Sequence, residues 1–95
     1  YPGPPGTCHD ECYIFTNMVA DALECAIHQI FNCPDTKSII FVGTRAANKR
    51  AFVGQNPFGK WVVPTLMRIK RVCGGKGDLW IGVKHTDKPY VEWKN

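Results

Sequence analysis

One stretch of the chain repeats its apolar residues with the period of a helix. These residues lie three and four positions apart and so share one helix face: Val19, Leu23, Ala26, Ile27 and Ile30. Thr16 and Asn17, both favourable helix N-caps, precede the stretch, and Pro34 follows it. The pattern predicts a single helix over residues 16–31.

Most of the remaining chain alternates apolar runs with turn residues, as strands do. The segments with this pattern are SIIFVG (38–43), RAFVG (50–54), KWVVPTLMRIKR (60–71), DLWIGVK (78–84) and PYVEW (89–93). Pro64 indicates a bulge, a kink or a sheet edge within the longest of them. The last two segments would form a hairpin around HTDK, with the facing pairs Lys84–Pro89, Gly82–Val91 and Trp80–Trp93.

One amphipathic helix followed by strands with short connections predicts an α+β fold. We expect one N-terminal α-helix packed on a twisted antiparallel β-sheet of four to five strands, whose other face is left to solvent or a ligand. The expected core includes Ile27, Ile40, Val53, Val63 and Ile81. The 95 residues suffice for a single domain, 1–95, with residues 1–7 (YPGPPGT) as a flexible arm.

Cysteine usage indicates an oxidising compartment. The chain has 5 cysteines and begins at Tyr1, so we expect a mature secreted protein from which a leader was removed. The cysteines expected to form disulfides, in a pairing that the sequence leaves open, are Cys8, Cys12, Cys33 and Cys73, with Cys25 as the candidate free thiol. Cys8 and Cys12 are too far apart for a zinc knuckle, so neither a metal nor another cofactor is expected. No apolar run reaches the roughly 18 residues of a membrane span.

Basic residues outnumber acidic ones, 12 to 8, and most of them lie in the second half of the chain. Such an asymmetry suits contact with a polyanion such as RNA, although it also serves solubility. The residues expected to contact RNA or another partner are basic or aromatic: Arg45, Lys49, Arg50, Phe58, Lys60, Arg68, Lys70, Trp80, Lys84 and Trp93. Residues 44–60 are expected to form an exposed loop that presents several of them.

The opening T-C-x-x-x-C-Y, formed by Thr7, Cys8, Cys12 and Tyr13, precedes Thr16 and the predicted helix. This pattern resembles the start of the fungal guanyl-specific ribonucleases, small secreted proteins with one helix on an antiparallel sheet. NKRAF (48–52), WVVPTL (61–66) and GDLWIGV (77–83) occupy the places of that family's guanine-binding loop and of its strands that carry a glutamate and an arginine. The resemblance covers most of residues 7–93.

At the positions where this resemblance places the family's catalytic residues, the chain has other residue types. The family's base falls at Val62, its phosphate-binding arginine at Leu79 and its acid histidine near Trp93. Its second histidine falls near Thr44, and its guanine-reading glutamate at Arg50. RNA cleavage needs a base, an acid and a cation at the phosphate. The resemblance therefore implies a chain with no catalytic residues, one that does not act as an enzyme.

A ribonuclease scaffold with an emptied site is similar to the RNase-like secreted effector (avirulence) proteins of cereal powdery mildew fungi, as is the ending DLWIGVKHTDKPYVEW. This resemblance implies a monomeric virulence protein, delivered into the host plant cell cytoplasm, that binds a host protein, RNA or the ribosome. It also implies recognition by a plant immune receptor of the NLR type. Those proteins commonly join an N-terminal cysteine to one near the C-terminus, whereas the last cysteine here is Cys73. Two alternatives stay open: an active secreted ribonuclease or ribosome-directed toxin, and a killer-toxin-like small secreted protein.

Overall fold

The computed structural model describes residues 8–16, 19–53, 63–87 and 91–94. Their elements follow in the order β1 (Glu11–Phe15), α1 (Val19–Asn32), β2 (Ser38–Gly43), α2 (Arg45–Val53), α3 (Val63–Val72), β3 (Trp80–His85) and β4 (Val91–Lys94). This is a small α+β domain, which confirms the coarse class expected from the sequence. Among the described helices, none is long and apolar enough to cross a membrane.

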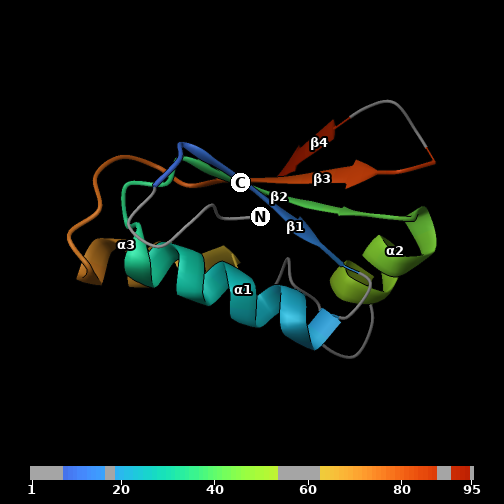
Figure 1. The fold of residues 1–95 in the computed structure, drawn as a ribbon, viewed down its shortest axis with the longest axis horizontal. Coiled ribbons are helices and arrows are strands. Elements are labelled where there is room, and N and C mark those ends of the chain that lie inside the picture. The colour runs from blue at the N-terminus through green and yellow to red at the C-terminus, as the bar shows by residue number, and fades with distance from the viewer. Residues whose placement is uncertain (1–7, 17–18, 54–62, 88–90, 95) are drawn as a thin grey trace.

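The strands form one sheet in the order β1-β2-β3-β4. β1, β2 and β3 run parallel to one another, and β4 pairs antiparallel with β3. Parallel neighbours need a crossover between them, which α1 supplies for the first pair and α2 with α3 for the second. Both crossovers advance in the same direction across the sheet, so the described helices all lie on one side of it (Figure 1).

The predicted antiparallel sheet is therefore wrong for its first three strands, and two of the predicted strands are helical. Residues 50–53 belong to α2, and residues 63–71 belong to α3. Pro64 lies in the first turn of α3, where its missing N–H costs nothing, and the buried residues of this helix, Val63, Leu66 and Lys70, recur at helical spacing. Thr44 caps α2, because its Oγ1 accepts a hydrogen bond from the Ala47 N–H at 3.1 Å.

Three other elements predicted from the sequence are present in the structure. The predicted helix is present as α1, and SIIFVG and DLWIGVK supply β2 and β3. The closing hairpin is antiparallel as expected, but its register is wrong by two residues, because Gly82 lies opposite Trp93 and Lys84 opposite Val91. The connection between β3 and β4 is correspondingly longer than a turn at HTDK, and Trp80 does not face Trp93.

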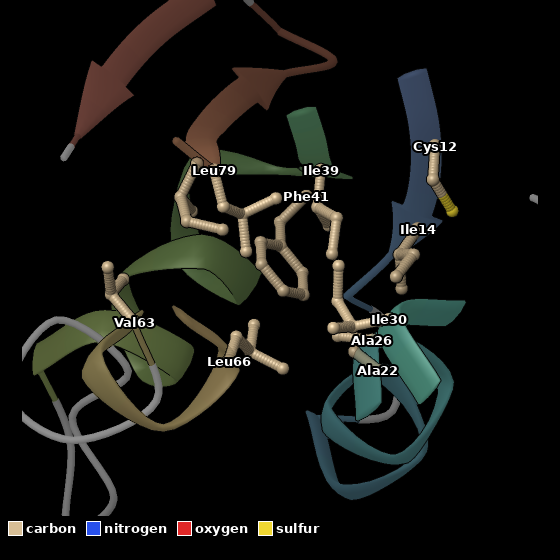
Figure 2. Packing of buried hydrophobic residues seen from close by; sticks show 11 residues of the cluster. Cys12, Ile14, Ala22, Ala26, Ile30, Ile39, Phe41, Val63, Leu66 and Leu79 are labelled. Atoms are coloured by element: carbon tan, nitrogen blue, oxygen red, sulfur yellow. The ribbon is translucent and has the colours of Figure 1, made fainter. Parts of the chain in front are cut away.

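The hydrophobic core lies between the sheet and the helices. Figure 2 shows Phe41 pointing from β2 into the space between α1 and α3, with Leu66 and Ala26 nearby. Of the expected core residues, Val63 and Ile81 are buried in the core cluster and half-buried Ile27 packs against it, whereas Ile40 is buried on the other face of the sheet. The side chain of Val53 lies outside the described residues.

One disulfide joins Cys8 to Cys33 and ties the segment before β1 to the end of α1. The prediction that Cys12 and Cys73 form disulfides is wrong, since both are free thiols, as is Cys25. Cys12 lies on the helix side of β1, where burial raises the pKa of its thiol above the ordinary value.

Candidate functional site: the open face of the sheet

β1 alternates buried and exposed residues, as a strand covered on one face does. Cys12 and Ile14 are buried against the helices, whereas Glu11, Tyr13 and Phe15 point to the opposite side. Tyr13 is 40% exposed and Phe15 is 62% exposed. Two aromatic rings therefore stand on the face of the sheet opposite the helix side. Figure 1 shows that the described helices all lie on the other side of the sheet.

The strand register carries this face across β2 and β3, because residues paired between strands share a face. Tyr13 pairs with Ile40, which pairs with Gly82, and the rows on either side run from Glu11 to Trp80 and from Phe15 to Lys84. We call this surface the open face; its residues on the three parallel strands are Glu11, Tyr13, Phe15, Ser38, Ile40, Val42, Trp80, Gly82 and Lys84.

The open face combines buried central residues with exposed aromatic side chains. We call the exposed aromatic residues, Tyr13, Phe15 and Trp80, the aromatic rim. Ile40, 1% exposed, and Val42, 8% exposed, are buried on the side of the sheet opposite the described helices. Trp80 is 48% exposed, and Lys84 is exposed in the same row as Phe15. Exposed aromatic rings that flank a cation supply stacking and electrostatic contact together, which suits a ligand with both flat apolar and anionic parts.

The partner-binding residues predicted from the sequence do not gather in one place. Trp80 and Lys84 lie on the open face. Of the other cations predicted to bind a partner, the exposed ones lie on helices, namely Arg45, Lys49 and Arg50 on α2 and Arg68 on α3. Phe58, Lys60 and the side chain of Trp93 lie outside the described residues, and the expected loop 44–60 is helical over residues 45–53.

Lys70 needs a correction, because it is 1% exposed and cannot present its charge to a partner. Its Nζ donates hydrogen bonds to the carbonyl oxygens of Pro34, at 2.8 Å, and Thr36, at 2.7 Å. These bonds hold α3 against the connection between α1 and β2, and they supply the partners that a buried ammonium requires. Lys70 is a structural residue.

A cluster of buried polar residues occupies the carboxyl end of the parallel strands. The Thr16 hydroxyl lies 2.6 Å from Asn48 Oδ1 and donates to it, and Asn48 Nδ2 lies 3.0 Å from His85 Nδ1 and 3.2 Å from the Lys84 carbonyl oxygen. Because the amide nitrogen is a donor, Nδ1 of His85 is the acceptor and a neutral ring carries its proton on Nε2. Thr16 and Asn48 are buried, as is His85, which ends β3 instead of lying in a turn.

This polar cluster holds the strand ends together and is closed to a ligand. Within the described residues, every buried side-chain nitrogen and oxygen has a hydrogen-bond partner. The positions matched to ribonuclease catalysis are also dispersed: Leu79 is fully buried in the core, Thr44 caps α2 and Arg50 is exposed on that helix. Val62 lies outside the described part of the chain.

A second surface feature is a shallow depression of about 330 Å³ along α1, lined by Asp21, Glu24, Cys25 and His28. Glu24 and His28 approach to 3.8 Å and are both exposed. Within the described ranges, no group of three or more histidine, cysteine or carboxylate residues has a geometry that could hold a metal ion. The depression therefore offers solvated polar groups and no formed site.

The two exposed rings of β1 are not among the binding residues predicted from the sequence. The signal was present in ECYIF, where Cys12 and Ile14 alternate with Tyr13 and Phe15 at the period of a strand. Because this stretch was interpreted through its cysteine spacing, its alternation went unused. The open face is thus the candidate site that the fold adds to the sequence.

Comparisons of this chain with models of protein families, with curated proteins and with solved structures find no match. The resemblance to ribonuclease-like effectors consequently rests on the short motifs alone.

Proposed function

We propose that this protein binds single-stranded RNA on the open face of its sheet without cleaving it. The observation that carries the proposal is the set of exposed rings of Tyr13, Phe15 and Trp80, on a face where Lys84 supplies a positive charge. Unstacked bases of single strands stack on such rings, while cations contact the phosphates. The net charge of +4 favours the approach of a polyanion.

The biological setting that we propose comes from the motif resemblance and from the cysteines. It is a secreted fungal effector that acts inside plant cells and is detected there by an immune receptor of the NLR type. The Cys8–Cys33 disulfide supports passage through an oxidising compartment. Binding without cleavage is proposed because Leu79, buried in the core, stands where the resembled ribonucleases place their phosphate-binding arginine.

The test is a titration of a fluorescently labelled single-stranded RNA followed by anisotropy. Phe15→Ala should weaken binding about 5- to 150-fold, the loss expected when one base no longer stacks. Phe31→Ala is the matched control, because Phe31 is 67% exposed on α1, in the layer beneath the sheet. An equal effect of the two substitutions, or no binding at low salt, would contradict an RNA site on the open face and favour a protein partner.

Salt dependence tests the role of the cation. The logarithm of the affinity should fall by about 0.7 per log unit of salt for each neutralised phosphate, so Lys84→Gln should reduce that slope by about 0.7. Lys76→Gln is the control, because Lys76 is exposed in the loop before β3. The same samples, incubated and then separated by size, should contain intact RNA; cleaved RNA would favour the active-ribonuclease alternative instead.

A further inference from the structure

β1 is an edge strand of the sheet, and it lacks the features by which proteins protect such edges. Within the described part of the chain it pairs only with β2. Glu11–Phe15 contains neither lysine nor proline, and its register with Ser38–Val42 runs without a bulge. An unprotected edge that also exposes Tyr13 and Phe15 is a template for pairing with another strand.

Two backbone hydrogen bonds at the ends of β1 fix which of its backbone groups point outward. The Asp10 carbonyl oxygen accepts from the Ser38 N–H at 3.0 Å, and the Thr16 N–H donates to the Val42 carbonyl oxygen at 2.9 Å. Because N–H and C=O groups point to opposite edges of a strand at successive residues, the even-numbered residues of β1 face β2. The N–H and C=O groups of Glu11, Tyr13 and Phe15 therefore point away from the sheet.

We propose that a second copy of this chain pairs antiparallel with β1 around a two-fold axis at Tyr13. This register places Tyr13 opposite its own copy and Glu11 opposite Phe15, so each outward-pointing residue meets another one. Such directly opposed residues exchange both of their N–H···O bonds. A shift of the axis leaves at least one of these residues without a counterpart inside β1, which makes Tyr13 the preferred centre.

The side chains suit the same arrangement. The two Tyr13 rings become cross-strand neighbours on the open face, and each Phe15 lies opposite Glu11 of the other copy, so the aromatic rims of the two sheets join. The charge of +4 is no obstacle at this edge, because β1 carries only the negative Glu11 and the exposed cations Arg45, Lys49 and Arg50 belong to α2. An isologous contact of this kind closes on itself.

Pairing through five residues per chain is a small contact, below the roughly 1,200 Å² typical of stable complexes. The dimer should accordingly form at high protein concentration and dissociate on dilution, which modifies the monomer expected from the sequence. This inference does not rest on RNA binding, because the pairing is argued from the backbone groups of the strand edge, although the dimer would bring the open faces of the two copies side by side.

Sedimentation equilibrium over a wide range of protein concentration tests the inference together with amide hydrogen exchange. The wild-type mass should approach twice the monomer mass at about 1 mM, and the amides of Glu11, Tyr13 and Phe15 should become protected as it rises. Tyr13→Pro removes the central outward N–H and leaves the bonds to β2 intact, so it should abolish both changes. Tyr13→Val keeps the N–H and should retain them.

Three results would overturn the proposal. The first is a monomeric mass throughout the concentration range. The second is protection of the three amides in the monomer, which would mean that another part of the same chain covers the edge. The third is a dimer whose formation is unchanged by Tyr13→Pro, which would place the interface elsewhere. Circular dichroism of each variant excludes loss of folding as the cause.

Discussion

Gly43, the last residue of β2, faces the buried polar cluster at the carboxyl end of the strands. A methyl group at this position would overlap the Thr16 hydroxyl and would lie 3.3 Å from Asn48 Oδ1 and 3.5 Å from the Ala47 side chain. Its φ angle is not among the positive ones, so an alanine there would be free of backbone strain. Space alone therefore decides whether alanine is tolerated.

The substitution Gly43→Ala should lower the free energy of unfolding by about 2–4 kcal/mol. Overpacking a tight site costs about 1–3 kcal/mol, and displacing Thr16 weakens its bond to Asn48, worth about 1 kcal/mol. Without the overlap, the free energy of unfolding would rise instead of fall. Replacing glycine by alanine at a compatible position stabilises a protein by about 0.4–1 kcal/mol, because it reduces the conformational entropy of the unfolded chain. The sign of the measured change thus reports the contact itself.

A double-mutant cycle measured by urea unfolding isolates this contact. Thr16→Ala should destabilise by about 1–3 kcal/mol, because Asn48 Oδ1 loses its donor, but it also makes room for the methyl group. The double variant should therefore be at least about 1 kcal/mol more stable than the sum of the single changes predicts. Gly74→Ala is the control: its φ of 84° strains an alanine, nothing lies within 4 Å, and its cost should add to that of Thr16→Ala. Additivity at Gly43, or stabilisation by Gly43→Ala, would refute the reasoning.

Two further predictions concern the cysteines. The Cys8–Cys33 bond closes a loop with a sequence separation of 25, so replacing both cysteines by serine should lower the free energy of unfolding by about 3 kcal/mol; an unchanged urea midpoint would contradict this. Because burial raises the pKa of Cys12, the folded chain keeps this thiol neutral above its ordinary pKa of 9.0, where the thiol of the unfolded chain ionises. The stability that this thiol contributes is complete below that value and falls as the pH rises above it. Cys12→Ala should therefore flatten the decline in unfolding free energy over alkaline pH. An identical decline in the wild-type protein and the variant would contradict this prediction.

The sequence by itself determined the elements whose pattern is complete within a short stretch. The spacing of Ala26, Ile27 and Ile30 predicted α1, and the apolar runs 38–43 and 78–84 predicted β2 and β3, because burial on one or both faces imprints a period that neighbouring residues share. The open second face of the sheet was also foreseen from a single strong helix. Of its exposed aromatic residues, only Trp80 was predicted to bind a partner. Tyr13 and Phe15 were not predicted, although buried and exposed residues alternate along β1 in the sequence itself.

The tertiary structure alone decided the direction of the strands and the burial of Lys70. Val63, Leu66 and Ile69 recur at the spacing of a helix, which the strand prediction did not use. Lys70 has the sequence character of a surface cation, and only the folded chain supplies the carbonyl oxygens of Pro34 and Thr36 that allow its burial. Parallel pairing likewise has no local signature, since it depends on which helices cross between strands far apart in the chain. A sequence pattern reports how each residue is shielded, but the partner that shields it is set by contacts between distant segments.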